Sequence, residues 1–405
     1  MDLSKKSLAI RWLYLILGVF SMLFAGVIYA WSILKAPLET AFGWTASELS
    51  LNFTITMCFF CLGGVAGSIL AERAGVKASV ILGGTLSAIG FVLTSALSGN
   101  DVIRLYLFYG MVSGSGIGIA YNTIISTVGA WFPDKKGVCS GCLMMGFGAS
   151  TLLLGNLSSA LFDFIGWRKT YFYVGIAMGI AIILTGILLE KPDAALMRQK
   201  GHNQGNGSTG YGDTDYTPKQ MLCRPSFWRV FLCLVCLSTV GSSVISFARD
   251  MSLSVGASTA VATMLVGVLS VCNGFGRIIT GALFDALGRR VTMILANLIA
   301  VCAAGVALVS VSIGSLPMCI VSLCLTGISY GSCPTLSSSV TSEFYGKKHF
   351  SSNFSVMNFN LMAASTIAAA SGALLSAYGN YAAPFALLLT LSLTALILNI
   401  SIERP

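Results

Sequence analysis

The sequence predicts an all-α membrane protein with twelve transmembrane helices in two six-helix bundles and both termini in the cytoplasm. Composition is the first reason: 55% of the 405 residues are hydrophobic and 10% are charged, whereas soluble domains carry roughly a quarter charged residues. The second reason is a series of apolar runs, each long enough to cross a bilayer. The third is an internal repeat that relates the two halves of the chain.

The apolar runs define the predicted transmembrane spans. The first run has full span length and lacks a small-residue cleavage site, so we expect it to be retained as the first helix. The twelve spans cover residues 12–34, 47–71, 78–98, 102–130, 138–162, 170–189, 226–248, 260–284, 291–312, 316–342, 351–376 and 381–402.

The basic residues give the orientation of these helices. Most of the 24 Lys and Arg flank segments that are cytoplasmic in this topology, as the positive-inside rule requires. The net charge of +9 therefore reflects orientation in a membrane, and nucleic acid is not expected as a partner. We expect a multi-pass protein of the cell (inner) membrane, surrounded by lipid. The basic residues predicted on the external side of the membrane are Lys35, Arg104, Arg168, Lys169 and Arg249, and Arg277 lies within a span.

The internal repeat divides the chain into two halves. SILAERAGVK, from Ser68, and GALFDALGRR, from Gly281, occupy equivalent turns, and Asp285 lies 213 residues after Glu72. GIAY at Gly118 is similarly echoed by GISY at Gly327. The predicted units are an N-terminal bundle over 1–189, a Gly-rich polar cytoplasmic linker over 190–225, and a C-terminal bundle over 226–405.

Arg277 is the residue around which the functional hypothesis is built. It precedes the polar stop at Asp285 by about eight residues, or ~12 Å of helix, which places it near the membrane midplane. Its guanidinium stays protonated, and a charge at that depth costs at least ~2.5 kcal/mol. Every Asp and Glu is predicted to lie at a span end, in a loop or at a terminus, so an anionic substrate is favoured as its partner over a buried structural ion pair. The repeat places Gly64 at the equivalent position, so the charge belongs to one half only.

Polar side chains at similar depth are candidates for the rest of the site. Asn273 lies one helical turn from Arg277 and can orient the guanidinium or a ligand. Tyr121 has a matching depth, Tyr330 lies somewhat further out, and phenols can donate to a carboxylate. Tyr29 either lines a cavity or bonds a neighbouring helix, and Asn360 in SNFSVMNFNLMAAS has the same two interpretations.

Other motifs in the chain predict no chemistry. The CxxC pairs lie within spans or near the start of one, where cysteine behaves as a small apolar residue, so no metal or cofactor is expected. GSGIG at Gly114 sits in an apolar span without a preceding strand and is interpreted as helix packing rather than as a nucleotide loop. Since no nucleophile–base set is evident, an enzyme is not expected.

Several of these motifs resemble the major facilitator superfamily. GALFDALGRR is similar to the superfamily's signature between spans 8 and 9, while the first copy departs from it at Ser68 and Glu72. YAWSILKAPLE, WFPDKKGVCSG, MLCRPSFW and NGFGR resemble the oxalate:formate antiporter family and its bacterial monocarboxylate-transporter relatives. The resemblance covers nearly the whole chain and implies the major facilitator fold.

The same resemblance implies roles for individual residues. The family's substrate-binding arginine corresponds to Arg277, and its tyrosines correspond to Tyr29, Tyr121 and Tyr330. A second cation of the oxalate antiporter falls on Leu361, beside Asn360, so a monoanion is favoured over oxalate. Animal monocarboxylate transporters have aspartate where this chain has Asn273, which places proton coupling of their kind in question. The charged turns of the signature imply an inner gate formed by Glu72, Arg73, Asp285 and Arg289.

Together these interpretations predict a monomeric secondary active transporter of small organic anions, most of all monocarboxylates of the lactate, pyruvate and formate class. The carboxylate would pair with Arg277 and apolar faces including Met145 and Leu361 would contact the rest, with alternating access between the bundles. A co-transported proton or an exchanged anion would be the coupling partner. The alternatives are oxalate or dicarboxylate exchange, a drug or organic-cation exporter with a structural Arg277, and a carboxylate receptor that does not transport.

Overall fold

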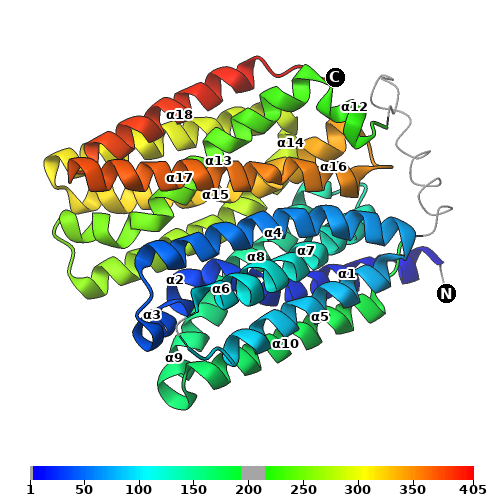
Figure 1. The fold of residues 1–405 in the computed structure, drawn as a ribbon. Helices are drawn as coiled ribbons and strands as arrows, with labels where there is room; N and C mark the ends of the chain where they lie inside the picture. The colour runs from blue at the N-terminus through cyan, green and yellow to red at the C-terminus, as the bar shows by residue number, and fades with distance from the viewer. Residues whose placement is uncertain (1–2, 100, 193–214) are drawn as a thin grey trace.

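The fold is known from a computed structural model that describes residues 3–99, 101–192 and 215–405. Over these ranges the chain forms helices and no β-strand. Figure 1 shows two groups of long, roughly parallel helices packed side by side, one from each half of the sequence. Both ends of the chain lie at the same end of the molecule. The predicted all-α architecture of two helical bundles is therefore confirmed.

The first group contains six long helical rods, several of which are interrupted. Its elements are α1 (Leu3–Ala25), η1 (Gly26–Ala30), α2 (Trp31–Leu34), α3 (Ala36–Phe42), α4 (Ala46–Arg73), α5 (Val76–Ser95), α6 (Val102–Leu105), η2 (Tyr106–Ser113), α7 (Gly114–Ala130), α8 (Lys136–Ser150), η3 (Thr151–Gly155), α9 (Asn156–Ile165) and α10 (Trp167–Leu188).

The second group repeats this arrangement after a short surface helix. Its elements are α12 (Pro218–Leu222), α13 (Pro225–Ser254), α14 (Thr259–Ile313), α15 (Leu316–Tyr345), α16 (Phe350–Met357), α17 (Phe359–Tyr378) and α18 (Ala382–Ile400).

The number of rods agrees with the twelve predicted spans. Ten helices of the described chain are long and apolar enough to cross a membrane, and one of them, Met264–Ile313, contains two spans because α14 is interrupted at Gly288. The 20-residue α17 is not among these ten helices, and it has the length of the remaining predicted span. Gly288 has φ 74° and ψ 175°, and Gly75, 213 residues earlier, has φ 91° and ψ 162°. Glycine is required there because other residues rarely adopt this region.

Side-chain caps explain where two of the long helices begin. Thr45 accepts a bond from the Glu48 amide while the Glu48 carboxylate accepts one from the Thr45 amide, so α4 starts with a capping box. The bond from the Thr45 backbone, followed by that from its hydroxyl, lowers the pKa of the Glu48 carboxyl. Ser258 likewise accepts a bond from the amide of Val261 and starts α14.

Four rods depart from regular α-helix, the first of them at η1, which is a 3-10 helix. η2 and η3 are π-helical segments, a conformation found frequently at functional sites. The rod formed by α16 and α17 is divided at Asn358, whose carbonyl accepts a bond from the Cys61 thiol of the other half at 3.5 Å. Discontinuous helices near the midplane are a common feature of transporter binding sites.

The predicted linker lies mostly outside the described residues, because 193–214 are not described. Its described end is fixed to the second group, where the Asp215 carboxylate accepts bonds from the backbone amides of Lys347 and Lys348 at 2.9 and 3.0 Å. The adjoining Tyr216 amide donates to the carbonyl of Tyr345. The domain boundaries at 189 and 226 stay predictions.

Glycine residues allow α8 of the first helix group and α14 of the second to pack closely together. Between helices in a bilayer the hydrophobic effect is weak, so association depends on close packing of small residues. A Cβ atom on Gly281 of α14 would collide with the carbonyl oxygen of Gly137 on α8, and one on Gly141 would lie 2.5 Å from the carbonyl oxygen of Arg277. α8 and α14 therefore approach backbone to backbone over at least one helical turn, and this contact carries Arg277 to the centre of the molecule.

Candidate anion-binding site

Arg277 lies at the interface between the two groups of helices and is only 1% exposed. Its Nη1 donates a short bond to the carbonyl of Met144 on α8, and its Nε donates to Oδ1 of Asn273, one turn earlier on α14, at 3.3 Å. Gly148 makes room for the guanidinium, since a Cβ there would lie 2.9 Å from Cζ of Arg277. Residues from both halves of the chain therefore fix the orientation of the Arg277 guanidinium.

One edge of this guanidinium is left without a protein partner. Nη2 of Arg277 is buried and makes no hydrogen bond within the described part of the chain. The ion pairs recorded over the same residues join Arg11 to Asp134, Lys77 to Glu190 and Arg104 to Asp101, and none includes Arg277. A buried cation without an anion is unfavourable. The arrangement therefore favours an external anion at Nη2.

Three tyrosines from three rods lie close enough to the same group to interact with its charge. Tyr29 of η1, Tyr121 of α7 and Tyr330 of α15 each interact electrostatically with Arg277. Tyr29 and Tyr330, from opposite halves, also interact with each other, and Tyr330 accepts a weak bond from Ser242 at 3.5 Å. Phenolic hydroxyls can donate to an anion that the guanidinium holds.

A glycine three residues before each tyrosine positions it. A Cβ on Gly26 would collide with the carbonyl oxygen of Phe147, and one on Gly118 would collide with that of Phe60. At Gly327 a Cβ would lie 2.6 Å from the carbonyl oxygen of Leu269. Residues i and i+3 share a helical face. The repeated Gly-x-x-Tyr pattern therefore brings each rod close to its neighbour and presents a phenol one turn away.

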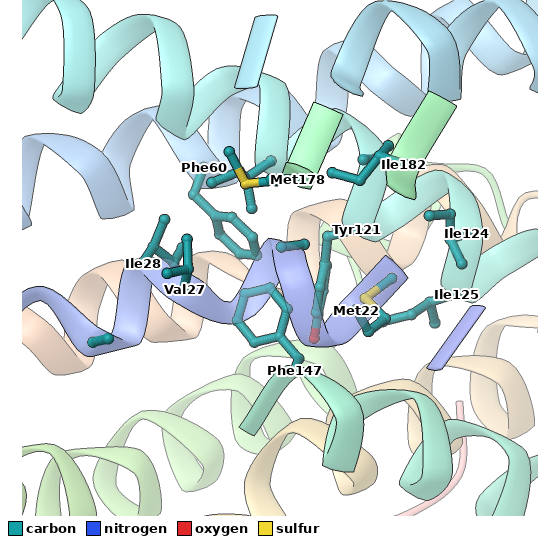
Figure 2. Packing of buried hydrophobic residues seen from close by; sticks show 14 of the residues in the cluster. Met22, Val27, Ile28, Phe60, Tyr121, Ile124, Ile125, Phe147, Met178 and Ile182 are labelled. Atoms are coloured by element: carbon teal, nitrogen blue, oxygen red, sulfur yellow. The ribbon is translucent and has the colours of Figure 1, made fainter. Parts of the chain in front are cut away.

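Aromatic rings form the wall on the N-terminal side. Tyr121 lies 5.0 Å from both Phe60 and Phe147, measured between ring centroids, and Tyr29 packs edge-on against Phe147 at 5.1 Å. Figure 2 shows the rings of Phe60, Tyr121 and Phe147 grouped at the centre of this half. Phe354 of α16 stacks on Tyr121 from the other half at 6.3 Å. The wall combines apolar faces with phenolic edges, as a small organic anion requires.

The remaining predicted binding residues lie around this centre with different contacts. Met145 faces Gly274 of α14, whose Cβ would lie 3.7 Å from its Cγ. Leu361 is nearly buried and packs with the hydrophobic cluster of the N-terminal half. Asn360 donates to the carbonyl of Met357 and accepts a bond from Ser238 of α13 at 3.4 Å. The packing interpretation of Asn360 thus has direct contacts in this structure.

Sequence reasoning missed the group that holds Nη1 and the residues that shape the pocket. The acceptor is the backbone carbonyl of Met144, and backbone oxygens carry no sequence signature. Gly148 and Phe147 belong to the GFGAS segment that follows. The third copy of Gly-x-x-Tyr, at Gly26, was a signal that could have linked Tyr29 to the other two tyrosines.

Two of the four predicted gate residues form bonds between the halves. The Asp285 carboxylate accepts bonds from the amides of Gly137 and Val138, both 2.9 Å, and so caps the first turn of α8. Glu72 accepts a bond from Ser352 at 3.2 Å. Arg289 instead contacts its own half, where it donates to the carbonyl of Ile402 and lies 4.9 Å from the ring of Phe344. Arg73 is exposed. The cross-gate bond expected of Arg289 is not formed here.

We expect Asp285→Ala to loosen the first turn of α8. The carboxylate satisfies two amides that have no intrahelical acceptor and lies at the positive end of the helix. Hydrogen–deuterium exchange of the Gly137 and Val138 amides should speed up about tenfold or more, the effect of losing charge-assisted bonds. Asp215→Ala is the matched control, because it releases two amides within one half; it should affect Lys347 and Lys348 only. Unchanged exchange at Gly137 and Val138 in Asp285→Ala would show that this cap is unimportant.

The cysteines and histidines of the described residues do not form a metal site. No group of three or more His, Cys, Asp or Glu side chains there could hold a metal ion, and the twelve cysteines carry free thiols. Cys61 and Cys139 are buried among apolar neighbours.

Comparison with known proteins places this geometry among transporters. A profile of the Major Facilitator Superfamily matches residues 14–249 and 230–405. The oxalate:formate antiporter of Oxalobacter formigenes is 27% identical over 284 residues, which are 70% of this chain and 65% of the antiporter. Monocarboxylate transporter 2 of Homo sapiens is 29% identical over 196 residues, 47% of this chain and 38% of that protein. The chain therefore aligns with less than two thirds of the length of either relative.

Solved structures share the fold at low sequence identity. A proton:xylose symporter of the superfamily superimposes with a TM-score of 0.76 at 14% identity, covering 100% of this chain and 97% of the symporter. A superfamily transporter solved in the outward conformation gives a TM-score of 0.73 at 15% identity, covering 97% of this chain and 99% of that one. At these identities the likeness concerns the fold alone.

Proposed function

The chain belongs to the Major Facilitator Superfamily, and we propose that it carries small organic anions, above all monocarboxylates, with the carboxylate bound at Arg277. It is a secondary transporter of this superfamily's type, a multi-pass membrane protein and not an enzyme.

The observation that carries the proposal is the free edge of Arg277. Nη1 is held by the Met144 carbonyl, whereas Nη2 is buried without a partner in the described chain and Nε has only a long bond to Asn273. A carboxylate could bond Nη2 and replace Asn273 at Nε, which gives the bidentate pairing that guanidinium favours. The surrounding tyrosines would donate to its remaining lone pairs.

The number of cations favours a monoanion. Arg277 is the buried basic side chain at this centre, and the position that the family resemblance marks for a second cation is Leu361 of α17. A dianion would bring a second charge into an aromatic and aliphatic wall with no partner, at a cost of several kcal/mol. The names of the relatives, an oxalate:formate antiporter and monocarboxylate transporters, fit a carboxylate substrate.

Transport would follow from alternating access. In this structure α8 meets α14, and Ser355 of α16 donates to the carbonyl of Gly64 on α4 at 2.9 Å, so the halves are joined at the end with the chain termini. Separation of these contacts would expose Arg277 to that side. Asn273 lies where a carboxylate would be needed for proton transfer beside Arg277, so we favour anion exchange or entry of a proton with the substrate.

A thermal-stability screen of the purified protein tests this function. Ligands that bind the folded protein stabilise it against unfolding and so raise its melting temperature. At a ligand concentration of a hundred times Kd, the stabilisation is about 2.7 kcal/mol. We expect C1 to C6 monocarboxylates to stabilise the protein, dicarboxylates to do so weakly, and Arg277→Ala to lose the response. The active ligand should then drive its own exchange across proteoliposome membranes.

Other results would identify the alternatives. Stabilisation by dicarboxylates alone would indicate oxalate-type exchange. Stabilisation by organic cations, unaffected by Arg277→Ala, would show that the arginine is structural and contradict the proposal. Binding without exchange in proteoliposomes would indicate a receptor.

A further inference from the structure

A cavity lies between the two halves of the chain, and none of the three tyrosines lines it. The cavity has a volume of about 770 Å³ and is lined by residues of both halves. Ser140 of α8 and Ser338 of α15, whose hydroxyls lie 2.9 Å apart, line it where the halves meet. Ser140 is one helical turn before Met144, the residue that binds Arg277. Neither Met144 nor Arg277 lines the cavity, whose lysines belong to segments predicted to be cytoplasmic.

Positive charge from both halves converges on this cavity. Five cationic side chains and two carboxylates line it, which leaves a surplus of three positive charges. Arg11 pairs with Asp134 at 2.9 Å, and Glu72 accepts a bond from Ser352. The cations are Arg11, Lys136 and Lys191 from the N-terminal half and Lys347 and Lys348 from the C-terminal half.

Hydroxyl groups fill the wall between these charges. Ser339, which is 3% exposed, lines the cavity with an Oγ that has no hydrogen-bond partner among the described residues. Ser342 accepts a bond from Lys136 of the other half at 3.0 Å. A buried hydroxyl without a partner is unfavourable unless a ligand completes it. Hydroxyl and ammonium donors together suit a ligand with several oxyanion acceptors.

The turn that carries Lys347 and Lys348 is held in place by the protein itself. Asp215 binds both of their backbone amides, and a Cβ on Gly346 would collide with that carboxylate. The backbone that carries the Lys347 and Lys348 side chains is therefore held in a fixed conformation. The positive-inside rule explains why lysines lie at this end of the molecule, but it does not require them to meet from two halves around one hydroxyl-lined cavity.

We propose that this cavity binds a phosphate-bearing anion from the cytoplasmic side and thereby holds the two halves together. A surplus of three charges matches a di- or trianionic phosphate better than a monocarboxylate. The ligand would contact Lys347 and Lys348 in one half and Arg11, Lys136 or Lys191 in the other. Opening toward the cytoplasm would separate these groups, so the bound anion favours the closed form and slows transport. The source is either a soluble phosphate compound or the headgroup of an anionic lipid.

The test uses the full-length protein in nanodiscs of neutral lipid at constant ionic strength, with inorganic pyrophosphate and ATP as soluble probes. We expect a rise in melting temperature with either probe, and an affinity at least about tenfold weaker in the double variant Lys347→Gln/Lys348→Gln. The matched control Lys135→Gln/Lys219→Gln removes two exposed lysines that do not line the cavity and should bind as the wild type does. A second arm replaces the probes with nanodiscs that contain phosphatidylglycerol.

Each result decides the proposal. Stabilisation by pyrophosphate or ATP that is lost only in Lys347→Gln/Lys348→Gln supports a soluble ligand, and the same pattern with phosphatidylglycerol alone supports a lipid headgroup. No stabilisation in either arm, or an equal loss in both double variants, overturns it. Arg277→Ala should leave pyrophosphate binding unchanged, so failure of the carboxylate site and failure of this site are distinguishable.

Discussion

Replacement of Arg277 by alanine is expected to lower carboxylate uptake into proteoliposomes at least ~30-fold, because truncation of one partner of a buried charge pair costs about 2–5 kcal/mol or more. The variant also removes the bonds to Met144 and Asn273 that orient this part of α14. Uptake of radiolabelled monocarboxylate, measured beside thermal unfolding of the same preparation, separates loss of binding from loss of folding.

Arg277→Lys provides the sharper comparison. Lysine keeps the charge but lacks the planar fork that bonds Met144, Asn273 and the substrate together. We expect a clear impairment, with uptake between that of the wild type and that of Arg277→Ala. Arg249→Ala, an exposed arginine at the predicted outer end of α13, is the control and should transport normally. Normal uptake by both Arg277 variants would remove the proposed site.

Gly141→Val is expected to have a comparably large effect through packing alone. A Cβ at Gly141 would lie 2.5 Å from the Arg277 carbonyl oxygen, in the other half of the chain, so the larger side chain must push α8 and α14 apart. Overpacking costs typically 1–3 kcal/mol, and each 1.4 kcal/mol changes a conformational equilibrium tenfold. We expect transport to fall about tenfold or more, with faster exchange of the Gly137 and Val138 amides.

The control for this variant is Gly305→Val on α14, beyond the break at Gly288. A Cβ at Gly305 would meet no atom within 4 Å, so valine should be accommodated there with little change. Because the Gly141 contact joins the halves and not the helices of one half, each bundle should still fold and the thermal transition should persist. If Gly141→Val exchanged and transported like the wild type, the closeness of α8 and α14 would have no role in closure.

The fold could be predicted from the sequence because its determinants are repeated and local. Each span must satisfy its backbone within lipid, so an apolar run of sufficient length is itself evidence for a helix. The break at Gly288 fell between two predicted spans, where the repeat also placed Gly75. The π-helical segments η2 and η3 were not predicted, since one extra residue in a helical turn changes no hydrophobic pattern.

The site was predictable where side-chain chemistry decides it. An arginine at midplane depth, with every carboxylate at a predicted span end, in a loop or at a terminus, indicated an anion site. The structure brings Tyr29, Tyr121 and Tyr330 near this arginine. The Met144 carbonyl could not be predicted because every residue has one. Arg289 was assigned to the gate from a motif, but its direction depends on packing against Phe344, which a motif does not encode.

The matched turns at Gly75 and Gly288 have a mechanical consequence. They give the two bundles equivalent scaffolds, yet the cation that would hold the cargo belongs to the C-terminal one. A carboxylate on Arg277 of α14 would therefore remain attached to the C-terminal bundle as the other bundle moves past it. The N-terminal bundle would move relative to the bound molecule, and its aromatic rings would be the surface whose contacts with that molecule change during transport.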